Sequence, residues 1–293
     1  MKQLGILILV LLIQNITFSQ TKKNEYPFKV ETKGKGKPII LIPGMASSGD
    51  VWNQTVDSLK TKYQCHILTL AGFEKQKPIN LEKGFLPRIK EEIVKYIKTE
   101  LNEKPILIGH SLGGFLILSI SSTYPKLLSK IIIIDSYPFG PLVYNPNATK
   151  QNIKPQAKQM KEMLLVASNS QFAAQQETAL KMMITDSNNI KLATKWSLES
   201  DRATIAQSTF ELMITDLRPE IKKVTIPILV LGSWYGLKNY GFTEEIVKAN
   251  YKNQFITAKN CKIKIAKKAK HFIMLDDPNW TLQEIKSFML AYE

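Results

Sequence analysis

Short runs rich in isoleucine, leucine and valine recur along the 293-residue chain, each bounded by proline, glycine or lysine. These runs are KPIILIPG, YQCHILTL, KPILIGHS, SKIIIIDS, IPILVLGS and CKIKIA. A run that is apolar at consecutive positions suits a strand buried on both faces. Helix-like segments at 51–62, 86–101 and 112–124 separate the runs. Strands that alternate with helices predict an α/β fold, with a mainly parallel, doubly wound sheet covered on both sides.

The interval 137–222 interrupts this alternation, because it contains helical patterns and no strand-like run. We predict that it forms an inserted all-helical cap, with the core at 20–136 and 223–293. Methionines recur within the cap at Met160, Met163, Met182, Met183 and Met213. Methionines at helical spacing usually fill a core, but their adaptable side chains would also suit a lid over an apolar substrate.

The amino-terminal segment MKQLGILILVLLIQNITFSQ has the layout of a secretory signal peptide, with Lys2 before an apolar run. That run, 4–13, is well short of the roughly 20 residues that a membrane-spanning helix needs. We therefore predict a signal peptide at 1–19, export to the periplasm or beyond the cell, and no stable membrane span.

The chain is strongly basic, with a formal net charge of +15. A basic balance can indicate nucleic-acid binding, but here the lysines are scattered and arginine occurs only at Arg88, Arg202 and Arg218. We therefore expect a lysine-rich solvated surface and no nucleic-acid partner. The densest cluster, KIKIAKKAKHF, adjoins His271 and could favour anionic substrates.

Ser111 lies in the sequence GHSLG, which matches the G-x-S-x-G pattern of a nucleophile elbow. The pattern alone is weak, and a tight turn with an inert serine is the alternative. Here, however, the motif follows a buried strand and opens an apolar helix, as the elbow requires. We predict that Ser111 is a nucleophile.

At this point the chain resembles the α/β-hydrolase family. Besides GHSLGG, the segment PIILIPGMASSGDVW is similar to the family's oxyanion loop, and AKHFIMLDDP is similar to its histidine loop. The helical interval also falls where family members carry a cap. The resemblance implies a serine hydrolase with a helical cap and with no metal or organic cofactor. It also implies that the backbone N–H groups of Leu112 and Met45 form the oxyanion hole.

A serine hydroxyl needs a base within hydrogen-bond reach, and the chain offers three histidines. His66 lies within a predicted strand, where a buried structural role is expected. His110 occupies the variable position of the elbow, and we expect its side chain to point away from the chemistry. His271 matches the family's catalytic base.

The acid that orients the base is not at its usual place in the family. The loop after PILVLGS reads SWYGLKNYGF and contains no carboxylate before Glu244 and Glu245. Some relatives place the acid after the preceding strand, and there Asp135 ends KIIIID. We predict Asp135 as the acid, with Glu244, Glu245 and a dyad supported by solvent as alternatives.

The two cysteines, Cys65 and Cys261, belong to strands that lie toward opposite edges of the family's sheet. Their sulfurs could not approach bonding distance there, so we predict two free thiols.

We therefore predict a serine hydrolase that cleaves a small-molecule carboxylic ester, or a related acyl bond, through an acyl-serine intermediate. Its acyl group is expected to be apolar. Two alternatives remain open: a cofactor-free lyase or carbon–carbon hydrolase on the same fold, and a non-catalytic binding protein on a hydrolase scaffold. The sequence does not choose among ester, thioester and peptide bonds, because fold alone does not specify chemistry.

Overall fold

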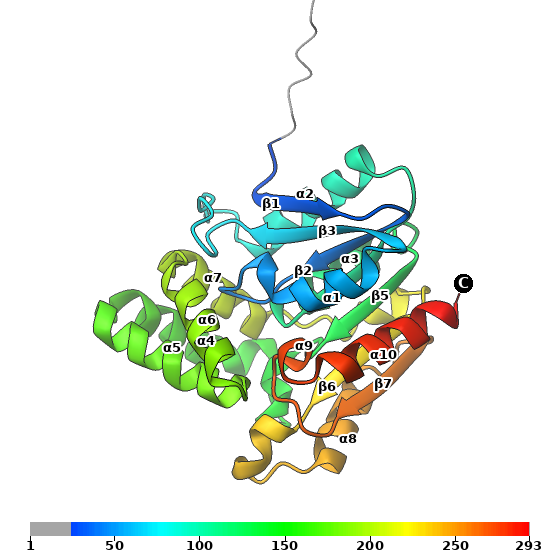
Figure 1. Ribbon diagram of the computed structural model, residues 1–293. Helices are drawn as coiled ribbons and strands as arrows, with labels where there is room; N and C mark the ends of the chain where they lie inside the picture. Colours follow the sequence, from blue (N-terminus) through cyan, green and yellow to red (C-terminus); the bar gives the residue numbers. More distant parts are fainter. Residues whose placement is uncertain (1–24, 293) are drawn as a thin grey trace, which may run out of the picture.

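A seven-stranded sheet forms the centre of the molecule, in the order β1-β3-β2-β4-β5-β6-β7 (Figure 1). The computed structural model describes residues 25–292, so the predicted signal peptide lies outside the described residues. Only β1 is antiparallel to its neighbour, and the other strands pair in parallel. The predicted mainly parallel sheet is thus confirmed. The strands are β1 Phe28–Lys33, β2 Lys37–Ile42, β3 Tyr63–Leu70, β4 Ile106–His110, β5 Lys130–Ile134, β6 Ile228–Ser233 and β7 Cys261–Ala266.

Helices cover both faces of the sheet, because the central strands are apolar on both sides. In β5, Ile131 and Ile133 join one core cluster, whereas Ile132 and Ile134 join the other. Each fully buried isoleucine stabilises the fold by about 1.5–3 kcal/mol relative to an exposed one. The first cluster is covered by α2 (Leu86–Glu100), α3 (Leu112–Thr123) and α8 (Glu244–Gln254). The second is covered by α1 (Asn53–Leu59), α9 (Ile273–Asp276) and α10 (Pro278–Leu290).

Four α-helices lie between β5 and β6, where the cap was predicted, and they form a separate group beside the sheet (Figure 1). They are α4 (Lys150–Val166), α5 (Asn169–Met183), α6 (Ser187–Leu198) and α7 (Arg202–Ile214). Polar side chains fix where α4 and α5 begin, since Thr149 and Ser168 each start a capping box. Within residues 25–292, no helix has both the length and the hydrophobicity needed to cross a bilayer.

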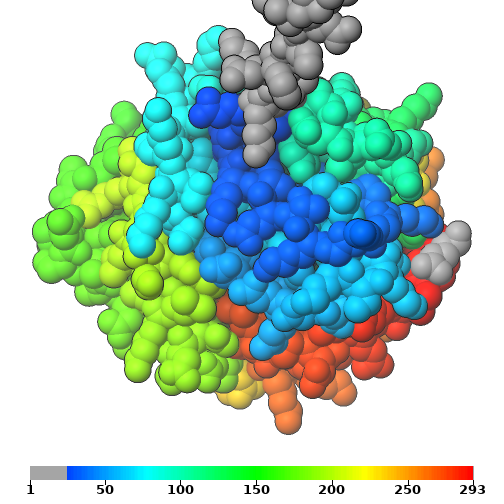
Figure 2. Space-filling model, turned by 45° about the horizontal axis from the view of Figure 1, so that its top comes forward, coloured from blue at the N-terminus to red at the C-terminus, as the bar shows by residue number. Residues whose placement is uncertain are grey.

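The cap is joined to the core through the segment between β3 and α2. Figure 2 shows part of this segment, in cyan, beside the yellow-green helices of the cap. Glu211 of α7 is buried, and its carboxylate accepts hydrogen bonds from the N–H groups of Phe85, at 2.9 Å, and Leu86, at 2.7 Å. A carboxylate at a helix N-terminus stabilises the unpaired N–H groups there. A cap helix therefore supplies the amino-terminal cap of a core helix.

The two cysteines lie on strands that are separated by four others, Cys65 on β3 and Cys261 on β7. Both are free thiols, as predicted. Burial raises the pKa of Cys65 to about 11 and that of Cys261 to about 12, so neither thiol is activated as a nucleophile.

Candidate active site

Ser111 occupies the sharp turn between β4 and α3. Its φ of 51° and ψ of −116° are a strained conformation for a residue with a side chain, and its N–H donates to Ile134 O at 2.9 Å. The turn requires both flanking glycines. A Cβ on Gly109 would lie 2.4 Å from Gly113 O, and a Cβ on Gly113 would lie 2.2 Å from Ile42 O. The local structure is therefore the elbow that the motif predicted.

Asp135 and His271 meet at the carboxyl end of the sheet. His271 Nδ1 lies 2.6 Å from Asp135 Oδ2. A carboxylate can only accept, so Nδ1 carries the hydrogen, and Nε2 is the nitrogen left to receive a proton. The carboxylate also accepts from Ser233 N at 2.7 Å, from Ser233 Oγ at 2.9 Å and from the Tyr251 hydroxyl at 2.7 Å. Four donors fix its position.

Tyr251 is a buried support of Asp135 that the sequence analysis missed. Burial, together with the charge of Asp135, raises the pKa of Tyr251 well above its usual value, so its hydroxyl keeps the hydrogen that it donates. The ring stacks on Tyr137 with centroids 4.0 Å apart. It also needs Gly232 in β6, because a Cβ there would lie 2.3 Å from the ring. No local pattern marks this partner, since α8 brings it in from a distant part of the chain.

Glu244 and Glu245, the alternative acids, lie in the first turn of α8. Thr243 caps this helix through its side chain, and Glu245 is exposed. Among the described residues, neither glutamate forms a hydrogen bond with His271. The histidine loop is therefore brought to Asp135 and not to these glutamates.

His66 is buried in β3, as predicted, with Nδ1 2.7 Å from the Tyr96 hydroxyl and Nε2 3.1 Å from Gln64 Oε1. Burial lowers its pKa. These contacts fit the expected structural role.

The prediction that His110 points away from the chemistry is wrong. Its ring is completely buried against His271, with centroids 4.6 Å apart, and against Phe272, at 4.5 Å. Its Nε2 lies 3.1 Å from His271 O, whereas Nδ1 is buried and has no hydrogen-bond partner among the described residues. Burial first, and the charge of His271 second, hold the pKa of His110 well below its usual value. His110 is thus a neutral ring that packs against His271. The sequence could not reveal this because the motif leaves the position free.

Ser111 and His271 line one cavity of about 110 Å³ between the core and the cap. The other core residues of its wall include Met45, Ser47 and Phe272. Helices α5, α6 and α7 supply the opposite wall, which includes Gln176, Leu180, Met183, Ala193, Ser197 and Ile205. Among the described residues, Ser111 Oγ and His271 Nε2 form no hydrogen bond with each other or with any other group. Both atoms are therefore free of competing partners in the part of the chain that the structure describes.

Two backbone amides lie where the oxyanion hole was predicted. Leu112 is the first residue of α3, so its N–H has no acceptor within the helix. Met45 follows β2 and lines the cavity, and the next residue, Ala46, has a φ of 54°. The Thr209 hydroxyl of the cap donates to Ile205 O at 2.9 Å and lies 3.5 Å from Met45 Sδ, so the loop contacts α7. The role of these amides stays a prediction.

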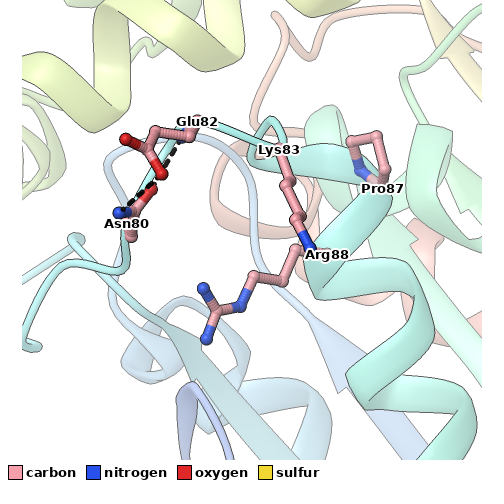
Figure 3. Close-up of a pocket in the computed structure, with 5 residues that line it drawn as sticks. All are labelled: Asn80, Glu82, Lys83, Pro87 and Arg88. Carbon is pink, nitrogen blue, oxygen red and sulfur yellow. Dashed lines mark hydrogen bonds between the residues drawn. The ribbon is translucent and has the colours of Figure 1, made fainter.

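A larger depression, of about 640 Å³, lies at the amino-terminal end of α2 (Figure 3). Figure 3 shows its wall, which is formed by Asn80, Glu82, Lys83, Pro87 and Arg88, with Asn80 donating to Glu82 at 3.3 Å. Neither Ser111 nor His271 lines it, so its size does not make it the candidate active site. Within residues 25–292, no cluster of three or more histidine, cysteine or acidic side chains could hold a metal ion.

Comparison with known proteins agrees with this architecture. The chain is 24% identical over 198 residues to the pimeloyl-[acyl-carrier protein] methyl ester esterase of Aliivibrio fischeri (strain MJ11), covering 68% of this chain and 75% of that one. It is 23% identical over 223 residues to the enzyme of the same name from Citrobacter koseri, covering 74% and 80%.

Solved structures share the fold at low sequence identity. MenH from S. aureus superposes with a TM-score of 0.72 at 14% identity, covering 90% of this chain and 98% of that one. The enol-lactonase from Burkholderia xenovorans LB400 superposes with a TM-score of 0.72 at 12% identity, covering 90% and 96%. A family model described as alpha/beta hydrolase fold matches residues 37–278. The chain therefore belongs to the α/β-hydrolase fold family.

Proposed function

We propose that this protein is a serine esterase in which Ser111 is the nucleophile, His271 the general base and Asp135 the residue that orients the base. One observation carries the proposal: Asp135 holds Nδ1 of His271 while His271 and Ser111 line the same cavity. The ester-hydrolysing names of the two esterase relatives support the same reaction class.

The reaction follows from these positions. Ser111 Oγ attacks the ester carbonyl carbon as His271 Nε2 takes the hydroxyl proton, and the carbonyl oxygen becomes an oxyanion. The N–H groups of Leu112 and Met45 stabilise that charge, and one such donor is worth about 2.7–4 kcal/mol. The intermediate collapses when His271 returns the proton to the departing alcohol. Water then attacks the acyl-serine with the same base and releases the acid.

Asp135 contributes by fixing the tautomer of His271 and by stabilising the imidazolium that forms in each step. Its carboxylate is itself fixed by Ser233 and Tyr251. This hydrogen-bonded acid supports a catalytic protein over a non-catalytic binding protein, which was considered because an acid was missing from its usual place. A lyase or carbon–carbon hydrolase would use the same three side chains, but no feature of the cavity favours it.

The substrate that we propose is a small carboxylic ester with an apolar acyl group. The cap wall of the cavity supports this, because Leu180, Met183, Ala193 and Ile205 present hydrocarbon to it. Apolar surface that leaves water on binding contributes about 25 cal/mol per Å². We also propose that 137–222 acts as one cap unit over the bound acyl group.

The test is a panel of ester, thioester and aminoacyl substrates offered to the wild type, Ser111→Ala and Ser287→Ala. Ser287 is a matched control, because it is an exposed serine of α10 that does not line the cavity. We expect ester hydrolysis that Ser111→Ala lowers by at least about 10⁴-fold, as in other serine hydrolases, and that Ser287→Ala keeps. Ester hydrolysis that survives Ser111→Ala would contradict the proposal.

We further propose that the protein is exported, which Lys2 and the apolar run at 4–13 support. Intact mass spectrometry of the protein made in a bacterial host should show a mature chain that begins close to Gln20. Recovery of only the full-length chain from the cytoplasm would contradict export.

A further inference from the structure

Two polar side chains stand in the otherwise apolar cap wall of the cavity. Gln176 belongs to α5 and Ser197 to α6, and both line the cavity with Ser111 and His271. Ser197 is buried, and its hydroxyl donates to Gln176 Oε1 at 2.8 Å. The pair therefore joins two cap helices at the cavity.

The hydrogen bond from Ser197 leaves the amide nitrogen of Gln176 without an acceptor. Because Oε1 receives the serine hydroxyl, the two Nε2 hydrogens point elsewhere, and among the described residues Nε2 has no hydrogen-bond partner. Its neighbours on the wall, Leu180 and Ala193, have no side-chain acceptor. When a bound substrate excludes water from this amide, the amide loses its hydrogen bonds to solvent at a cost in free energy. A substrate that brings an acceptor to this amide avoids that cost, whereas a pure hydrocarbon does not.

The lack of a lysine or arginine in the described cavity wall restricts which substrate acceptor can bind Gln176. No lysine or arginine of the described residues lines the cavity. Lys270, the neighbour of His271, donates instead to the carbonyl oxygens of Lys181, at 2.6 Å, and Ile184, at 2.9 Å. A buried carboxylate would lack a cationic partner here and would be costly to desolvate. The acceptor that fits the wall is thus neutral, as a carbonyl oxygen is.

We infer that Gln176, held by Ser197, is a specificity-determining residue that donates to a second, neutral carbonyl group of the ester substrate. The inference rests on the proposed esterase function and narrows its substrates to esters that carry a further ketone, ester or amide carbonyl. The apolar wall then contacts the hydrocarbon of the substrate between its ester group and its second carbonyl group.

The experiment compares esters that differ only in one carbonyl. On the acyl side, 4-nitrophenyl hexanoate is compared with its 4-oxo and 5-oxo analogues. On the alcohol side, propyl hexanoate is compared with 2-oxopropyl hexanoate. The wild type should favour at least one oxo ester by about 10- to 100-fold in kcat/KM, since one hydrogen bond to a desolvated donor corresponds to about 1–3 kcal/mol.

Gln176→Met removes the donors but keeps an unbranched side chain of similar length. It should abolish the preference by lowering kcat/KM for the oxo ester alone, and Ser197→Ala should weaken the preference. Gln175→Met is the matched control, because Gln175 is the exposed neighbour on α5 and does not line this cavity. Its preference should equal that of the wild type.

If the wild type hydrolyses both members of every matched pair at equal rates, the inference is overturned. This outcome depends on the wild type alone, so it counts even if both variants fail to fold. An equal loss on both members of a pair in folded Gln176→Met would also overturn it. In both cases Ser111-dependent hydrolysis would leave the esterase function standing. If the wild type hydrolyses none of these esters, the proposed function fails, and the inference fails with it.

Discussion

On the core side of the cavity, the reactive groups are fixed by the backbone and by buried hydrogen bonds, whereas on the cap side the wall is made of side chains on helix surfaces. Ser111 is held in a turn that only flanking glycines allow, and Asp135 accepts four hydrogen bonds. Across the cavity, Gln176 has one side-chain hydrogen-bond partner within residues 25–292, Ser197. We therefore expect substitutions of Gln176 in the cap wall to leave the positions of Ser111, Asp135 and His271 unchanged.

The core and the cap also differ in how much of each element is buried. In α3 of the core, ten of the twelve residues are buried, as are all five residues of β5. In the cap, α4 buries only Ile153 and Ala157, and α5 buries only Phe172 and Leu180. The exposed methionines of α4, Met160 and Met163, are therefore not core filler. Changes in the core should alter the rate on every substrate, and changes in the cap should alter which substrate is preferred.

Among the variants that test this contrast between core and cap, the largest effect is expected for Asp135→Asn. An amide in place of the carboxylate favours the wrong tautomer of His271, so kcat should fall by about 10³- to 10⁴-fold, with KM little changed. The loss should be the same for all ester substrates, unlike that of Gln176→Met. Steady-state kinetics on three esters measures it, and thermal unfolding checks that the variant is folded.

A double substitution tests whether the two residues act as a unit. Adding Asp135→Asn to His271→Ala should cost almost nothing further, because residues of one catalytic unit are strongly non-additive. A further large loss would mean that Asp135 acts independently of His271. A change in substrate preference with Asp135→Asn would contradict the expectation that core residues affect all substrates equally.

A smaller effect, on stability, is expected at the joint between cap and core. Glu211→Ala leaves the N–H groups of Phe85 and Leu86 without their acceptor. Each buried donor without a partner costs about 1–3 kcal/mol, so the free energy of unfolding should fall by at least about 2 kcal/mol. Urea denaturation measures this change.

Two variants serve as controls for that joint. Glu211→Gln keeps one acceptor oxygen and should lose less stability than Glu211→Ala. Glu177→Ala removes an exposed carboxylate of α5 that pairs with Lys181, and it should change stability little. If Glu211→Ala were as stable as the wild type, the hydrogen bonds from Phe85 and Leu86 to Glu211 would not stabilise the contact between cap and core.

The smallest effect is the pH dependence that His110 gives to stability. Its pKa in the folded protein is well below the usual value, while in the unfolded chain it takes up a proton near pH 6.5. The stabilising contribution is therefore complete above about pH 6.5 and is lost as pH falls below it. His110→Gln should lose about 1–2 kcal/mol less stability than the wild type between pH 6.5 and 5.0, from a slope of at most about 1.4 kcal/mol per pH unit. Equal losses in the two proteins would contradict a buried, neutral His110.

Much of the fold could be predicted from the sequence, because strands buried on both faces leave an unmistakable apolar run. The amphipathic edge strand β1, FKVETK, was missed for the opposite reason, since its polar residues hide the pattern. The strand, turn and helix around GHSLG predicted the elbow, and the resemblance to the α/β-hydrolase family predicted the meeting of Asp135 with His271. The contacts of Tyr251, Glu211 and His110 could not be predicted, because each depends on which distant surface packs against it.

The central claim is that Ser111 is the activated nucleophile of this fold. Labelling with a serine-reactive fluorophosphonate, followed by peptide mass spectrometry, tests it most directly. We expect one adduct per wild-type chain, located on Ser111, slow labelling in His271→Ala and Asp135→Asn, and none in Ser111→Ala. An adduct on another serine, or no adduct in a wild type that still hydrolyses esters, would contradict the account.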